Sequence, residues 1–557
     1  MIEVLQSKKP AQVRPLAPTP RAPWWVYAGI LAVAAAVYLV NLGTALDFDL
    51  DEVMYAIAGQ NVADAGSVSW GEQPTSVHPP LHFLLVGAWT LLLGSAHGSV
   101  VDALFDARYL GAALSVVAVA LVGLLARRYT RNGWMIAAAM VVAVVNGFLV
   151  RFGRTALIEP TAIVAGLTVV YLALRLRRSP SPIYIGVVGI VSGLALLIKE
   201  PLVFTVLVPV LAAALERDGA YLRRTCAAVL VAVLVWGTFP AWAVLNGAGA
   251  WWWSEHDTSI QRISGLLQVS GLNRPGVSST GVFGDTFVTY ASGYLTFGLG
   301  AIGLLVVAYR GGLFHRRRLR ARHASLLAFG VLSYGFLAYC VLLGQANEQL
   351  TAYSAVPAVL LCVLAWGRRI PKVVAAALAV IVLVGVAVWS GTVAVSRDDA
   401  TSRMGRYLTA TAPCSPVNAT GNALRWAPVL PRNHVEAYRD GGEALQAGVR
   451  LFLLSPKDSR MRYGTSSPEL DSFVRAYGTL LQQYPSRRYE RIELWSVPAP
   501  GLAVRECGNA RPPVSASASV PLFLLLLGST VALIALVTYS WHVVARRRAW
   551  AREWAKR

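Results

Sequence analysis

Charged residues are scarce in this chain. Only 14% of the 557 residues are charged, 55% are hydrophobic, and the mean hydropathy is +0.53. A water-soluble protein of this length would need far more polar surface, so the composition excludes that class and predicts a polytopic α-helical membrane protein. The net charge of +21 does not indicate nucleic-acid binding, because the basic residues occur in short clusters between apolar runs, as they do in cytoplasmic loops.

Basic residues are absent altogether from residues 22–107, although lysine and arginine total 50. This stretch begins with an apolar run, about Trp24 to Gly43, and continues as a loop whose acidic residues include Asp47, Asp49, Asp51, Glu52, Asp64 and Glu72. Because lysine and arginine are enriched in cytoplasmic loops, we expect the acidic loop outside the cytoplasm and the apolar run as a retained anchor. We therefore predict a multi-pass plasma-membrane protein with both termini in the cytoplasm.

The later basic clusters set the expected number of membrane spans. When every cluster is placed on the cytoplasmic side, two spans fit between neighbouring clusters. The predicted fold is polytopic and α-helical, with about 12–13 transmembrane helices and a small extracytoplasmic α/β domain before the last one. The predicted spans are residues 24–43, 108–126, 134–150, 160–174, 183–198, 202–215, 225–245, 293–309, 325–343, 351–366, 373–395 and 520–544.

The expected domain organisation follows from these spans. Residues 1–21 are Pro-rich and basic and predict a disordered cytoplasmic tail. Residues 22–395 are expected to form the transmembrane domain, with outer loops at 45–107 and 246–292. The polar residues 396–519 predict the outer domain, with strands at 449–455 and 491–497 and a helix at 469–483. The last span is expected at 520–545, before a basic cytoplasmic tail at 546–557.

The apolar segment from Pro79 to Gly94 does not fit the alternation of spans. It has 16 residues, opens with two prolines and contains His82. A full span needs about 20 residues, and a span here would reverse every later loop. A re-entrant or interfacial helix on the outer face is therefore favoured, with a full span as the alternative.

The five cysteines fall into two groups. Cys226, Cys340 and Cys362 lie in apolar spans and are expected to pack there. Cys414 and Cys507 bracket the predicted outer domain. Outside the cytoplasm, a disulfide between these two is favoured over a pair of free thiols.

Ionisable and aromatic residues gather at the predicted outer ends of the first spans. They are Asp51, Glu52, Tyr55, His78, Arg108, Arg154, Glu159 and Lys199. Each has a structural explanation of its own, such as a helix-start acid, a helix cap, an interfacial anchor or an internal salt bridge. Ionisable residues this close to membrane spans are usually functional, however, so the set as a whole favours a site.

Carboxylates and cations in one outer site suit the transfer of a sugar from a lipid phosphate. Asp51 and Glu159 would share the site with Arg108, Arg154 and Lys199. A carboxylate can act as general base on an acceptor hydroxyl or amine. The cations would stabilise the departing phosphate, on which charge develops in the transition state. The donor would be a polyprenyl phosphate in the bilayer, since nucleotide sugars are not available outside the cytoplasm.

On these residues the chain resembles the GT-C glycosyltransferases, especially the branch of the protein O-mannosyltransferases and aminoarabinose transferases. The resemblance covers roughly residues 24–215, and the later spans and outer domain are similar in layout. The matching motifs are Asp51-Glu52 with Tyr55, His78-Pro79-Pro80-Leu81 with Gly94, Arg108, Arg154 with Glu159-Pro160, and Lys199.

The resemblance implies roles for these residues in a polyprenyl-phosphate-sugar-dependent hexosyl- or pentosyltransferase that inverts the anomeric carbon. It implies Asp51 as the catalytic base with Glu52 beside it, and Arg108 and Lys199 at the donor phosphate. The remaining matches are expected to bind donor or substrate: Arg154, His78, Tyr55 and Glu159, which stands where the relatives usually have Asp. No cofactor is certain. A divalent metal ion held by Asp51 and Glu159 is left open, because some GT-C enzymes use one.

Two other classes of function stay open at this point. A transporter or flippase of a lipid-linked sugar would show inverted repeats, and the sequence has no clear repeat. A non-catalytic scaffold that binds a cell-wall partner would not need Asp51, Arg108 and Lys199 at matching depth. The expected partners are a polyprenyl-phosphate sugar donor, an extracytoplasmic acceptor (glycan, protein or lipid) and the bilayer. Neither the sugar nor the acceptor can be read from the sequence.

Overall fold

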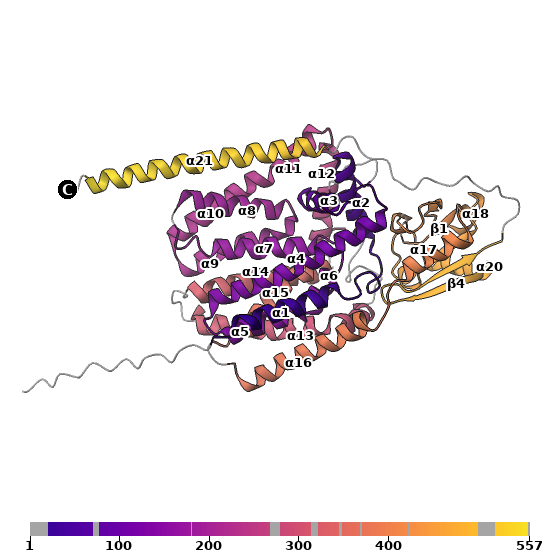
Figure 1. Ribbon diagram of the computed structural model, residues 1–557, viewed down its shortest axis with the longest axis horizontal. Helices are drawn as coiled ribbons and strands as arrows, with labels where there is room; N and C mark the ends of the chain where they lie inside the picture. Colours follow the sequence, from indigo (N-terminus) through magenta and orange to yellow (C-terminus); the bar gives the residue numbers. More distant parts are fainter. Residues whose placement is uncertain are drawn as a thin grey trace, which may run out of the picture.

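Long apolar helices run side by side through most of the molecule, and a small sheet domain stands at one end of them (Figure 1). The computed structural model describes residues 21–70, 77–179, 181–267, 279–313, 321–344, 348–367, 370–421, 423–426, 428–498 and 519–554. The helices outside the sheet domain are α1 (Trp24–Leu39), α2 (Leu50–Ala65), α3 (Leu81–Leu93), α4 (Val100–Tyr129), α5 (Gly133–Val144), α6 (Gly147–Gly153), α7 (Glu159–Ala173), α8 (Pro182–Leu196), α9 (Val203–Glu216), α10 (Gly219–Trp236), α11 (Thr238–Leu245), α12 (Gly249–Ser264), α13 (Ser279–Gly311), α14 (Ala321–Leu342), α15 (Glu348–Leu364), α16 (Lys372–Trp389) and α21 (Val520–Trp554).

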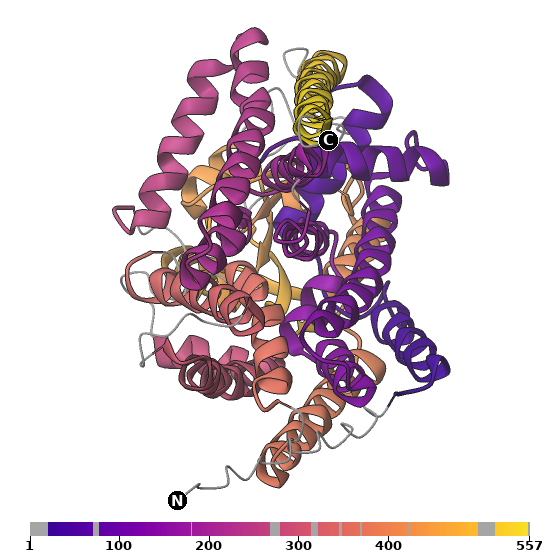
Figure 2. The same ribbon diagram turned by 90° about the vertical axis from the view of Figure 1, so that its left-hand side faces the viewer.

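The helices confirm a multi-pass membrane protein. Within the described ranges, six helices are long and apolar enough to cross a membrane, or seven if the bent pair α5–α6 is one span. Five further apolar helices, among them α1, α7 and α15, have 10–17 residues. The last span, α21, lies at the edge of the bundle (Figure 2), and only 11% of its most apolar window is buried, against 56% for α4. Most of its surface is therefore available to lipid.

Helix α3 is formed by the apolar segment from Pro79 to Gly94, which did not fit the predicted alternation of spans. It has 13 residues and ends at Gly94, which adopts a left-handed conformation with φ of +79°. At 1.5 Å per residue it is about 20 Å long, too short for a hydrocarbon core of about 30 Å. It packs against α2 beside the sheet domain's end of the bundle (Figure 1). The re-entrant or interfacial placement stays a prediction.

The sheet domain has five strands in the order β2-β1-β3-β5-β4. Pairs β1–β2 and β1–β3 are parallel, and β3–β5 and β4–β5 are antiparallel. Successive residues of β3 face opposite sides: Leu453 packs in the core that includes α17, and Phe452 packs in the core that includes α20. The elements are α17 (Ala400–Thr411), β1 (Val417–Ala419), β2 (Val435–Glu436), α18 (Gly441–Gln446), β3 (Leu451–Leu454), α19 (Pro456–Arg460), α20 (Pro468–Tyr477), β4 (Thr479–Ser486) and β5 (Glu490–Ser496).

One sequence prediction about these regions was wrong in part. The helix predicted at 469–483 ends at Tyr477, and Thr479–Ser486 forms β4, because pairing with β5 outweighs the local amphipathic pattern. The outer loop predicted at 246–292 contains helix α12, and α13 already begins at Ser279. The predicted strands at 449–455 and 491–497 correspond to β3 and β5.

The sheet domain is anchored to the acidic loop that leads into α2. The backbone N–H of Asp398 donates to the carbonyl of Thr44 at 2.8 Å, and that of Thr401 donates to the Asp47 carboxylate at 3.1 Å. Arg488 forms an ion pair with Asp49, and the Tyr489 hydroxyl donates to the carbonyl of Phe48. These contacts hold the domain directly over the start of α2.

Candidate active site

The start of α2 fixes the direction of its acidic side chains. Asp49 is the N-cap, and its carboxylate accepts from the backbone N–H of Asp51 at 3.4 Å. The Glu52 carboxylate closes the capping box by accepting from the backbone N–H of Asp49 at 3.0 Å. The side chain of Asp51 takes no part in this cap and points elsewhere.

Glu52 and Arg108 are buried against each other. The Arg108 guanidinium donates from Nε and Nη2 to the two Glu52 carboxylate oxygens at 2.8 and 2.9 Å, and both side chains are 0% exposed. The backbone N–H of Ala156 also donates to Glu52, and Arg108 also donates to the carbonyl of Leu46. Neither residue lines the cavity described below. The pair that was expected at the reaction centre and the donor phosphate instead joins α2, α4 and the α6–α7 turn.

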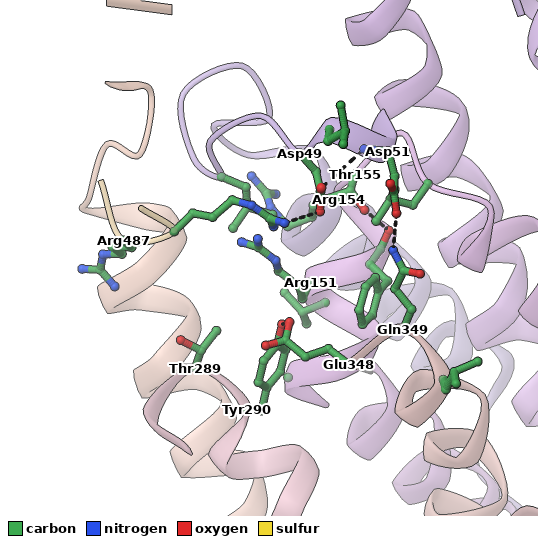
Figure 3. Close-up of a pocket in the computed structure, with 18 of the residues that line it drawn as sticks. Asp49, Asp51, Arg151, Arg154, Thr155, Thr289, Tyr290, Glu348, Gln349 and Arg487 are labelled. Atoms are coloured by element: carbon green, nitrogen blue, oxygen red, sulfur yellow. Dashed lines mark hydrogen bonds and ion pairs between the residues drawn. The ribbon is translucent and has the colours of Figure 1, made fainter. Parts of the chain in front are cut away.

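Asp51 lies in the wall of a cavity of about 1130 Å³ between the bundle and the sheet domain. Its Oδ2 accepts a hydrogen bond of 2.8 Å from the Gln349 side chain (Figure 3). Burial and, after it, the nearby Asp49 charge raise the pKa of Asp51 to about 6, against the opposing effect of the Gln349 hydrogen bond. A carboxylate with this pKa is ionised at neutral pH and suits a general base.

Tyr55 and His78 form the wall next to Asp51. Both line the cavity, and their rings meet edge to face with centroids 5.7 Å apart. Burial, followed by the nearby positive charge of Lys199, holds the pKa of His78 well below its usual value, so the imidazole is neutral. The structure thus brings two predicted site residues together with Asp51.

Lys199 reaches the same cavity from the turn before α9. Its ammonium group donates to Oε1 of Glu159 at 2.5 Å, and the Tyr353 hydroxyl donates to the same oxygen at 3.3 Å. Glu159 is fully buried and does not line the cavity. Glu159 therefore holds Lys199 in place from behind.

Arg154 serves the backbone of α1. Its guanidinium donates to the carbonyls of Val37, Tyr38 and Val40 at 2.7–2.9 Å, and these carbonyls at a helix end have no partner within the helix. The side chain is fully buried, with little of it facing the cavity that it borders. Its contacts favour structural support over ligand binding.

Arg151 and Arg488 line the cavity and were not among the predicted site residues. Arg151 precedes Arg154 by one turn, and in the described part of the chain its guanidinium has no ion pair or hydrogen bond. Figure 3 shows Arg151 directed toward the space in front of Asp49. The 60° bend between α5 and α6 sets this direction. Its spacing from Arg154 could have indicated it, whereas Arg488 lies 439 positions from Asp49 and gave no local signal.

The structure shows no metal-binding group around Asp51 and Glu159, the two residues for which a divalent ion was left open, within the described ranges. Within the described ranges, no group of three or more His, Cys, Asp and Glu side chains is arranged to hold a metal ion. Asp51 is engaged by Gln349 and Glu159 by Lys199. No step below depends on a metal ion.

The cysteines of the bundle are free thiols, namely Cys226, Cys340 and Cys362. Cys414 is disulfide-bonded. Its expected partner, Cys507, lies outside the described residues.

Comparison with known proteins supports the resemblance. Residues 88–217 match the family model of dolichyl-phosphate-mannose-protein mannosyltransferases, a segment that includes Arg108, Arg154, Glu159 and Lys199. No curated protein matches the chain.

Solved structures match over most of the chain. ArnT from Cupriavidus metallidurans, bound to undecaprenyl phosphate, has a TM-score of 0.53 at 14% identity, covering 86% of this chain and 99% of its own. The Archaeoglobus fulgidus oligosaccharyltransferase, in complex with Zn and sulfate, has a TM-score of 0.55 at 12% identity, covering 84% and 72%. The chain has the GT-C fold.

Proposed function

We propose that this protein is a membrane glycosyltransferase that moves a sugar from a polyprenyl-phosphate donor to an acceptor outside the cytoplasm. One observation carries the proposal: Asp51, with its raised pKa, shares a large cavity with the unpaired cation Arg151 and with Lys199. The mannosyltransferase family match and the likeness to ArnT bound to undecaprenyl phosphate support the choice of donor.

In the proposed reaction Asp51 is the general base. It removes the proton from an acceptor hydroxyl or amine as that atom forms a bond to the anomeric carbon. The bond from the anomeric carbon to the phosphate oxygen breaks, and its electron pair leaves with the polyprenyl phosphate. This single displacement inverts the anomeric centre, and Arg151 and Lys199 stabilise the charge on the leaving phosphate.

Glu52, Arg108, Glu159 and Arg154 act in this proposal as positioning residues. Glu52 holds the start of α2 through the capping box, and Arg108 compensates its charge. Glu159 orients Lys199, and Arg154 caps α1. In this proposal these four residues match the family motif because they hold the site in shape. Their side chains do not reach the reacting atoms.

The basic clusters support this side of the membrane. Arg128 and Arg175 both lie over the Tyr171 ring, and Arg224 donates to the carbonyl of Leu176, so three clusters gather in one place. The turn between α9 and α10, which belongs to this group, lies at the end of the bundle away from the sheet domain (Figure 1). With these clusters in the cytoplasm, the cavity faces outside.

The test is turnover of defined lipid donors by the full chain in nanodiscs. Undecaprenyl-phosphate-linked hexoses and pentoses, radiolabelled in the sugar, are supplied with a cell-envelope extract as acceptor, and nucleotide sugars serve as the control donor. The proposal expects label in product and release of undecaprenyl phosphate from one lipid donor only. A flippase would leave the sugar–phosphate bond of every lipid donor intact, and that result would overturn the proposal.

A further inference from the structure

The sheet domain presents one short segment, residues 457–463, to the cavity that Asp51 also lines. Lys457, Arg460, Met461 and Tyr463 all line the cavity. They come from α19 and from the turn that follows it, so the reaction space is closed by a part of the chain far from the motifs of the bundle. The polyprenyl donor approaches from the bundle side, which leaves this side for the acceptor.

Backbone geometry holds the turn in this position. Arg462 and Gly464 both adopt left-handed conformations, with φ of +46° and +60°. Gly464 lies directly against the backbone of Gly421, where a Cβ would be 1.5 Å from the Gly421 carbonyl oxygen. The Tyr463 N–H donates to the carbonyl of Asp458 at 2.9 Å. Tyr463 is thus presented by a fixed turn.

Positive charge on this wall is not balanced. The sheet domain contributes five cations to the cavity and two carboxylates, Asp398 and Asp458. Asp458 pairs with Arg425 at 3.0 Å, and Arg488 is taken by Asp49. Lys457 has no ion pair in the described part of the chain, and neither does Arg487, which donates to the carbonyl of Gly391 and to Ser396.

Arg460 adds to this excess. Its partner is Glu490 at 2.6 Å, but the side chains are 61% and 41% exposed. Exposed ion pairs contribute little and exchange readily for other partners. Lys457 and Arg460 are therefore available to an anion that enters the cavity.

Tyr463 supplies an aromatic surface beside these cations. Its side chain is partly exposed and lines the cavity. Burial raises the pKa of its hydroxyl, and the charges of Asp51 and Asp49 raise it further. Tyrosine offers an apolar face and a polar tip, a combination that suits a sugar ring.

We infer that Lys457, Arg460 and Tyr463 form the acceptor subsite, and that the acceptor is a saccharide that carries a negative charge. This inference rests on the proposed function. The Tyr463 ring packs against the sugar, the two cations hold its phosphate or carboxylate, and one hydroxyl faces Asp51, which takes its proton. The saccharide is either free in solution or attached to a lipid, and both forms share this chemistry.

The experiment compares neutral and anionic sugars on the full chain in nanodiscs. Binding of mannose, mannose 6-phosphate and octyl mannoside 6-phosphate is measured by saturation-transfer NMR, and undecaprenyl phosphate binding is measured on the same samples. The wild type is compared with Lys457→Gln/Arg460→Gln, with Tyr463→Ala, and with Arg432→Gln/Arg439→Gln, which removes two exposed cations of the same domain that do not line the cavity.

We expect the anionic sugars to bind about tenfold or more tightly than mannose, since hydrogen bonds between charged groups are strong. Lys457→Gln/Arg460→Gln should lose this preference and keep undecaprenyl phosphate binding, the Arg432/Arg439 control should keep both, and Tyr463→Ala should weaken all the sugars. Tighter binding of the octyl form indicates a lipid-linked acceptor, and equal binding a free one; either supports the inference.

No preference in the wild type, or a preference that survives in Lys457→Gln/Arg460→Gln, would overturn the inference. Loss of undecaprenyl phosphate binding in that variant would also overturn it, because the cations would then serve the donor. The remaining outcome is that the wild type prefers anionic sugars but neither it nor any variant binds undecaprenyl phosphate. The proposed donor would then be wrong, and the anionic subsite would stand.

Discussion

The Gln349 side chain donates a hydrogen bond of 2.8 Å to Oδ2 of Asp51, although the two residues are 298 positions apart. Gln349 lies at the start of α15, in the second half of the bundle. Through this hydrogen bond the second half of the bundle lowers the pKa of the proposed base.

Removal of this hydrogen bond should shift the pH dependence of transfer. Asp51 must be ionised to act as a base, and its pKa is about 6, so kcat/KM is expected to be half-maximal near pH 6 and to fall below it. The Gln349 hydrogen bond lowers that pKa, so Gln349→Leu should move the acidic limb to higher pH. A pH profile of kcat/KM measures the shift.

The control for that profile is Gln261→Leu, whose amide hydrogen-bonds Asp257 on the exposed helix α12. Its acidic limb should match the wild type. An unmoved limb in Gln349→Leu would show that Asp51 does not set the pH dependence.

The unpaired cation Arg151 should matter for lipid-phosphate affinity and not for folding. Arg151→Gln removes charge-assisted contacts to the phosphate, and undecaprenyl phosphate should bind about 10- to 100-fold more weakly. The unfolding temperature should stay near that of the wild type, because the guanidinium has no protein partner among the described residues. Arg406→Gln, on the exposed side of α17, is the control. Unchanged lipid affinity in Arg151→Gln would remove Arg151 from the phosphate site.

The buried pair of Glu52 and Arg108 should act on stability first. Arg108→Leu leaves the Glu52 carboxylate buried without its partner, which costs about 3–5 kcal/mol of folding free energy. Thermal unfolding of the detergent-solubilised chain should show a clear drop in midpoint. Glu469→Gln, which breaks an ion pair with Arg462 on the surface, should leave the midpoint in place. Equal midpoints for both variants would contradict the structural role of Arg108.

The contact of Gly464 with Gly421 should tolerate no side chain. Gly464→Ala places a methyl group against the Gly421 carbonyl and at an unfavourable φ, and the sheet domain should unfold at a temperature lower by about 5 °C or more. Gly528→Ala in α21, where a Cβ meets nothing within 4 Å, should unfold like the wild type. Differential scanning fluorimetry measures the unfolding temperature of both variants. An unfolding temperature of Gly464→Ala equal to that of the wild type would mean that this contact does not fix the turn.

The bundle could be predicted from the sequence because each span leaves a local signal in hydropathy and basic flanks. The predicted span 160–174 and helix α7, for example, differ by one residue at each end. The partners of the site residues could not be predicted. The roles of Arg108 and Arg154 depend on which backbone and side chains surround them in three dimensions, and a buried ion pair and a phosphate site look the same in a linear motif.

The residues that the sheet domain contributes to the cavity could not be predicted from the sequence either. Arg488 reaches Asp49 only because residues 398–401 and 488–489 dock on the loop before α2. The bend at Asn146, whose side chain caps α6, likewise aims Arg151 at the cavity. Its sign in the apolar run from 134 to 150 is the dipeptide Asn146-Gly147, which does not give the direction of the bend.

The most direct test of the account is sugar transfer by Asp51→Asn. Membranes that hold equal amounts of wild type, Asp51→Asn or Asp64→Asn are supplied with radiolabelled polyprenyl-phosphate sugars. Asp64 lies at the far end of the same helix and away from the cavity. The account predicts that Asp51→Asn loses transfer by about 10²- to 10⁴-fold but still binds undecaprenyl phosphate, and that Asp64→Asn transfers like the wild type. Equal labelling by wild type and Asp51→Asn would contradict it.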